Sequence, residues 1–146
     1  MTRIFDDNNN RRWHVSVNVA SIKRVKALLG VDLLAITDGN LLERIIGDPV
    51  QLCDILYALC QPQAQLDEVT DEQFGQGLCG DSIEHATTAL LESLADFFPS
   101  GKRQVLHKAL AKIREVEAKA IELANQKLDS AELTQRMESL LAAPGA

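Results

Sequence analysis

The 146-residue sequence predicts a mainly α fold, a small helical domain with an N-terminal β-hairpin and a long amphipathic C-terminal helix. Three observations indicate this class. Alternation of apolar and polar residues is confined to the first twenty residues, apolar residues recur at helical spacing in most of the remainder, and the longest such stripe follows residue 102. We expect one helical domain over residues 1–128 and a helical extension with a frayed tail over residues 129–146.

The predicted hairpin occupies about residues 3–19. Asp and Asn in "DDNNN" tolerate turn conformations, and the following "RRWHVSVNV" alternates, with Trp13, Val15, Val17 and Val19 on one face. Because an isolated two-stranded hairpin is only marginally stable in water, this face should pack on the helices. No later strand is predicted to cover the edges of the sheet, so we interpret Trp13, Val15 and Val17 as a candidate edge or oligomer contact.

Several short helices should follow the hairpin. The first covers residues 20–29, and Gly30 supplies its left-handed end. Asp32 should cap a short helical turn in "VDLLAI", and Asn40 should cap "LLERIIG". Asp48 in "GDP" begins the next helix as its N-cap, and the stretch "QPQAQLDE" after that helix reads as a loop.

The second half of the chain contains three further helical segments. Thr70 and Gln73 have the spacing of a capping box, and the glycines of "GQGLCG" should keep the helix that they open short. A stronger helix begins at residue 81 or 82 and ends at "FFP". Ser100 begins the last long helix, and "LDSAELTQRMESLL" either continues it or restarts a helix after Asp129-Ser130.

The long helix has an apolar stripe that either packs on the preceding helices or remains free. A helix of roughly 27 residues is about 40 Å long, which is more than a domain of this size covers. We therefore interpret part of the stripe as a surface for another helix. The candidate partner-binding residues are Val105, Leu106, Ala109, Leu110, Ile113, Val116, Ala120 and Ile121.

The net charge of −6 is unevenly distributed. No Lys or Arg occurs between Arg44 and Lys102, whereas ten acidic residues do, and six basic residues then lie within residues 102–119. The acidic middle is typical of a solvated face that binds a partner or repels nucleic acid. Basic residues of the hairpin and first helix could contact phosphates, but a pI near 5 makes nucleic acid an unlikely partner. These residues are Arg3, Arg11, Arg12, Lys23, Arg24 and Lys26.

No constellation of residues indicates catalysis, a metal or a cofactor. His14, His85 and His107 are isolated from Cys and acids at ligand spacing, so we expect no metal site. Cys79, between glycines, could be a reactive nucleophile, but we favour a small residue in a tight turn because no base is recognisable near it. The letters "GQGLCG" resemble a dinucleotide loop but follow a helix rather than a strand. We therefore expect a protein that is not an enzyme.

The apolar runs are far shorter than the roughly 18 residues of a membrane span. An apolar signal core is also missing from the N-terminal residues, so we expect a soluble protein that is not exported and makes no membrane contact. The odd number of cysteines predicts reduced thiols, and Cys53 and Cys60, seven residues apart, should share a buried helix face.

Over roughly residues 4–120 the sequence resembles the phage tail assembly chaperones. The similarity is found at "WHVSVNVASIKRVKALLGVDLL", "LLERIIGDPVQLCDILYALCQPQ" and "VTDEQFGQGLCGDSIEHATTALLESLADFFP". It implies a small helical protein of a phage or prophage that acts in the cytoplasm of the bacterial host and is absent from the particle. It further implies that the chain coats the helical tape measure protein, keeps its apolar surfaces soluble and recruits tail tube protein.

The charge pattern is compatible with such a role. An amphipathic helix can cover the apolar stripe of a helical client, and acidic and basic regions on one chain permit head-to-tail stacking into a homo-oligomer or array. Three other hypotheses stay open at this point: a structural neck or tail protein of the particle, a DNA-binding regulator that uses the basic first helix, and, last, an enzyme that uses Cys79.

Overall fold

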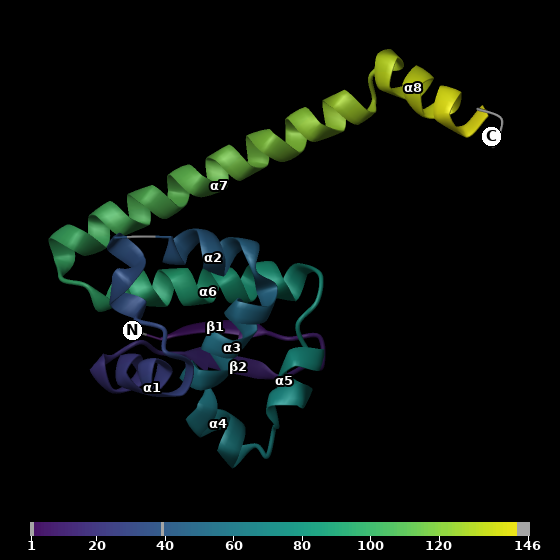
Figure 1. Ribbon diagram of the computed structural model, residues 1–146. Helices are drawn as coiled ribbons and strands as arrows, with labels where there is room; N and C mark the ends of the chain where they lie inside the picture. Colours follow the sequence, from purple (N-terminus) through teal and green to yellow (C-terminus); the bar gives the residue numbers. More distant parts are fainter. Residues whose placement is uncertain (1, 39, 143–146) are drawn as a thin grey trace. The chain divides into compact units, whose positions relative to one another are not determined.

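The computed structural model describes residues 2–38 and 40–142 and confirms the predicted fold class (Figure 1). Helices dominate, a single antiparallel hairpin lies at the N-terminus of the described chain, and a long helix follows residue 100. The chain separates into two compact units, Met1–His107 and Lys108–Ala146, each of which is described by itself. The expected domain limit at residue 128 stays a prediction, because compactness does not show which segments fold independently.

The hairpin consists of β1 (Arg3–Asp6) and β2 (Arg12–Val15), with Phe5 opposite Trp13. It is shorter than the alternating pattern predicts. Val17 lies outside the strand and Val19 begins the next helix, because Asn18 and Ser21 form a capping box in which each side chain accepts the other's backbone N–H. The cap ends the alternation four residues early, and Val19 is exposed rather than on the buried face.

Three of the four predicted caps before residue 50 are confirmed. Helix α1 (Val19–Leu29) ends at Gly30 in the left-handed conformation, Asp32 caps the 3₁₀ helix η1 (Leu33–Thr37), and Asp48 caps α3 (Pro49–Leu59). The fourth is wrong: Asn40 makes no side-chain bond to α2 (Leu41–Gly47). Its backbone lies near φ −101° and ψ 14°, outside the extended conformation that a capping side chain usually requires.

The segment predicted as a loop after α3 contains helix α4 (Gln61–Leu66), so that prediction is wrong. Its proline falls in the first turn, where the missing N–H would have had no helical partner in any case. Helix α5 (Asp71–Gln76) opens with the expected box, in which Gln73 N donates to the Thr70 hydroxyl and Thr70 N donates to the Gln73 amide. Helix α6 (Asp81–Phe97) begins and ends as predicted.

The core of the first unit lies between the hairpin and the helices. Helix α6 runs along β1, and α1 packs against α3 (Figure 1). The rings of Trp13 and Phe74 of α5 meet edge to face, with 4.8 Å between their centroids. The ring centroid of Tyr57 in α3 lies 5.4 Å from that of Phe74. Trp13 is completely buried, so the hairpin is part of the core, as its dependence on the helices requires.

Helix α7 (Ser100–Leu128) is continuous, and α8 (Ala131–Ala142) starts again after Asp129-Ser130. Of the two alternatives for this segment, the restart is therefore confirmed. Ser130 accepts a bond from Leu133 N and serves as the new cap. Neither helix contains a buried residue, so the stripe of α7 is not core. Apart from Ala142, the tail expected to fray lies outside the described residues.

Candidate partner-binding surfaces

The hairpin turn is held by a buried carboxylate. Asp7 accepts bonds from the backbone N–H groups of Asn9 and Arg11 and, at 2.9 Å, from the indole N–H of Trp13. The turn also contacts the glycine-rich loop before α6, where Asn8 N donates to Gly77 O at 2.8 Å. A Cβ on Gly77 would lie 2.7 Å from the Asp7 carboxylate. The glycine in "GQGLCG" therefore permits close packing of the hairpin turn.

One predicted contact surface, the β2 edge, is largely occupied from within the chain. The side-chain amide of Gln63 in α4 donates to Arg12 O at 2.8 Å and accepts from His14 N at 3.0 Å, as a neighbouring strand would. The Trp13 and Val15 side chains are completely buried, and Val17 lies beyond the strand. Sequence reasoning missed Gln63 because it falls in the segment read as a loop, and no local signal marks a side chain that bonds strand residues 49 and 51 positions away.

The second predicted surface, the stripe of α7, is accessible. Val105, Val116 and Ile121 are 65, 56 and 64% exposed, and Leu123 and Leu128 extend the exposed apolar surface beyond the predicted residues. Of the remaining five, Ala109 and Ala120 are exposed, whereas Leu106, Leu110 and Ile113 are partly exposed. The helix thus brings all eight residues onto one side, because their spacings follow the helical repeat.

Basic residues line one flank of this stripe. Lys108, Lys112 and Lys119 are four and seven residues apart and therefore share that flank. Lys112 and Lys119 both approach the Glu115 carboxylate, at 3.8 and 3.7 Å. Such exposed, loose pairs contribute little, and the three lysines outnumber Glu115 and Glu122 on this flank, so the flank remains positive.

The start of α7 is fixed to α6 by a charged cluster. Asp96 accepts bonds from Arg3 at 2.9 Å and from the ring of His107 at 3.0 Å, and Arg3 also pairs with Glu92 at 3.3 Å. Burial disfavours the Asp96 carboxylate, but the bonds from Arg3 and His107 outweigh it and lower its pKa. Arg3, one of the candidate phosphate contacts, is thus engaged within the protein.

Two shallow grooves that the sequence did not indicate flank α3 and share Asp54; we call them the α3 grooves. One has a volume of about 320 Å³ and is lined by Val50, Leu52, Leu78 and Ile83 among others. The other has a volume of about 240 Å³ and includes Leu28, Leu29, Tyr57 and Asp71. Val50 is 71% exposed, so apolar side chains reach the surface here.

The α3 grooves are acidic as well as apolar. Partial burial, followed by the charges of Asp71 and Asp48, raises the pKa of Asp54. Burial, with Asp54 and Asp71, also raises the pKa of the neighbouring Cys53 thiol to about 11. Residues 45–101 supply no Lys or Arg to the rim, and Arg24 of α1, which reaches the lining residue Ala58, is engaged there with Ala58 O at 3.0 Å. The grooves therefore favour a cationic partner.

Burial disfavours the thiolate form of two of the three cysteines. Burial raises the pKa of Cys60 to about 12, which makes its thiolate even scarcer than that of Cys53. Of the predicted buried pair, Cys60 is buried and Cys53 only partly so. Cys79 is exposed, and its sulfur accepts a bond from the Asn8 amide in the turn contact described above.

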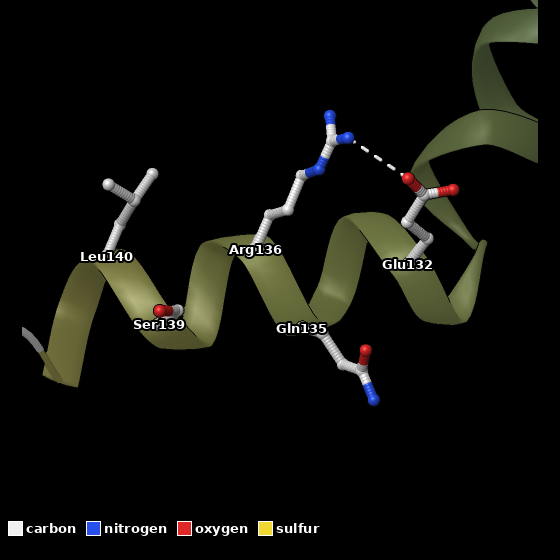
Figure 2. A pocket seen from close by; sticks show the side chains of 5 residues that line it. All are labelled: Glu132, Gln135, Arg136, Ser139 and Leu140. Atoms are coloured by element: carbon white, nitrogen blue, oxygen red, sulfur yellow. Dashed lines mark hydrogen bonds and ion pairs between the residues drawn. The ribbon is translucent and has the colours of Figure 1, made fainter.

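A hollow beside α8 has no feature of a binding site (Figure 2). Arg136 pairs with Glu132 one turn earlier at 3.0 Å, and both side chains are largely exposed. Figure 2 shows Leu140 on the same side of the helix as Arg136, while Gln135 points away from them. The five lining residues all belong to this one helix, so no second element closes the hollow.

Searches of protein-family models, curated proteins and solved structures found no match for the chain. Within residues 2–38 and 40–142, no group of three or more His, Cys, Asp or Glu side chains could hold a metal ion. Across the same described ranges, no helix combines the length and apolar character needed to cross a membrane.

Proposed function

We propose that the chain is a non-enzymatic phage tail assembly chaperone that acts in the host cytoplasm. It binds the helical tape measure protein, keeps it soluble and helps to recruit tail tube protein. The observation that carries this proposal is the exposed apolar stripe of α7, a helix of 29 residues without a buried side chain. The sequence resemblance supplies the identity of the client.

The stripe suits a client that is itself a long amphipathic helix. Val105, Val116 and Ile121 would pack into the apolar stripe of that helix and cover it from water. Each copy contributes only a few exposed aliphatic residues, so many copies along the client would bind together and still dissociate one by one. Reversible cover of this kind is what a tape measure protein needs until tube subunits replace the chaperone.

Co-expression with the tape measure protein of the same phage or prophage tests the proposal. The wild-type chain should keep the tape measure protein in the supernatant, whereas Val116→Asp combined with Ile121→Asp should let it precipitate. Ala118→Asp combined with Ala111→Asp adds the same charges to exposed positions on the opposite side of α7 and should retain wild-type activity. Equal precipitation with and without the wild-type chain would refute the chaperone function.

Mass spectrometry of purified particles separates the chaperone from a structural neck or tail protein. A chaperone should be missing from mature particles, and a stoichiometric amount in them would favour the structural role.

A DNA-binding regulator is the weaker candidate, because Arg3, Arg12 and Arg24 are all bonded within the chain. A salt-sensitive complex in a gel shift at low salt would revive it.

A further inference from the structure

We propose that the α3 grooves of one copy bind the stripe of α7 from a second copy, so that the protein assembles head to tail. The inference concerns self-association and goes beyond the proposed function. The two surfaces belong to different units, and each is argued from its own residues.

The first surface requires a partner that is both apolar and cationic. Leu28, Val50 and Tyr57 give the α3 grooves an apolar lining, and Asp54 lies between them on a rim that also carries Asp71. The Asp54 side chain is exposed, and the neighbouring carboxylates of Asp71 and Asp48 repel its charge. An ammonium group brought close to Asp54 would relieve that repulsion, which an apolar partner without charge could not do.

The second surface has that chemistry. Between Lys108 and Lys119, α7 places Ile113 and Val116 in the stripe and three lysines along its flank. This segment of 12 residues is about 18 Å long, and α3, with 11 residues, is about 16 Å long, so one can lie along the other. Apolar residues would then enter the α3 grooves while Lys112 and Lys119 approach Asp54 and Asp71.

A contact between two different surfaces is heterologous. A pair of copies keeps one unused groove face and one unused stripe, so growth continues into a ring or an open array unless a surface is removed. A client helix that takes the α7 stripe would compete with the next copy for it. Self-association would then cover the stripe before a client arrives, if the proposed function also holds.

Sedimentation equilibrium of the full chain with one surface removed at a time tests the inference. Wild-type protein should form species whose mass grows with concentration, and association should weaken in about 1 M NaCl, where the Debye length is about 3 Å. Asp54→Lys should prevent binding at the grooves, and Val116→Asp should prevent binding through the stripe. Each should raise the dissociation constant of self-association at least about tenfold. Asp67→Lys, exposed and outside both grooves, is the matched control and should associate like wild type.

Mixing the two variants gives the decisive result. The intact stripe of Asp54→Lys should bind the intact groove of Val116→Asp, which yields a one-to-one dimer and nothing larger. A wild-type monomer at all concentrations, a mixture that stays monomeric, or a mixture that forms arrays would each overturn the proposal.

Two controls keep that result interpretable. The thermal melt and the fluorescence of Trp13 report whether each variant is folded. Val50→Lys, at a highly exposed position in the groove, gives a second groove variant if Asp54→Lys unfolds, and it should act in the same way because it removes an apolar contact and repels the lysines of α7. A monomeric Asp54→Lys that still solubilises the tape measure protein separates failure of self-association from failure of the chaperone function.

Discussion

Helices α6 and α7 both carry an apolar stripe, but their environments are opposite. Along α6, eight residues are buried, among them Leu90 and Leu94, whereas α7 is 12 residues longer and buries none. The hairpin packs along α6, which gives its apolar stripe a partner within the first unit. An amphipathic pattern therefore identifies a face that needs cover but does not say whether the same chain supplies it.

The largest expected effect tests this contrast directly. Trp13→Ala should reduce the free energy of unfolding by about 4 kcal/mol, because it empties the space beside Phe74 and leaves Asp7 without its indole donor. Val116→Ala in the exposed stripe should change it by less than about 0.5 kcal/mol. Urea unfolding followed by circular dichroism measures both. Equal losses would mean that the α7 stripe is part of the folded core.

The packing of the hairpin turn predicts the next effect. Gly77→Ala should destabilise the protein by about 2 kcal/mol, because the added methyl group would push against the Asp7 carboxylate. Gly47→Ala, where nothing lies within 4 Å of the new Cβ, is the matched control and should be neutral or slightly stabilising. Thermal melts of the two variants compare them, and a tolerant Gly77 would show that the turn contact is loose.

The charged cluster at the start of α7 predicts a pH dependence. The native pKa of Asp96 is lowered, so its contribution is fully present above the unfolded value of about 3.9 and is lost as the pH falls through the native pKa. Asp96→Asn should cost about 1 kcal/mol at pH 7 and lose less stability than wild type on acidification below about pH 4. Urea titrations across that range measure the difference, and parallel profiles would contradict it.

The smallest expected effect lies in the α3 grooves. The native pKa of Asp54 is raised, so the ionised carboxylate disfavours folding at neutral pH, and the penalty disappears as the pH falls below the unfolded value of about 3.9. Asp54→Asn removes the cost of partial burial and the repulsion from Asp71 and Asp48, and should therefore stabilise the monomer at pH 7. The gain should be only about 0.3 kcal/mol, because solvent screens most of these effects at an exposed side chain. Asp67→Asn should leave the unfolding midpoint unchanged, and a less stable Asp54→Asn would mean that Asp54 makes a favourable contact.

Most helix boundaries could be predicted from the sequence because their signals are local. Gly30, Asp48 and the Thr70–Gln73 box act through bonds that span only two to four residues, and all three are confirmed. The failures are local as well: Asn40 has the residue type of a cap without its backbone conformation, and α4 was obscured by a proline in its first turn.

The sequence by itself determined the fold class, the hairpin, the long final helix and the segregation of charge. Only the tertiary structure decided that Gln63 bonds the β2 edge, that Gly77 faces Asp7, and that Asp54 lines two grooves. It also showed that α6 has a partner along its stripe and that no residue of α7 is buried. The physical reason is distance along the chain: periodicity and caps express bonds between near neighbours, whereas edges, close approaches and grooves arise where segments tens of residues apart meet.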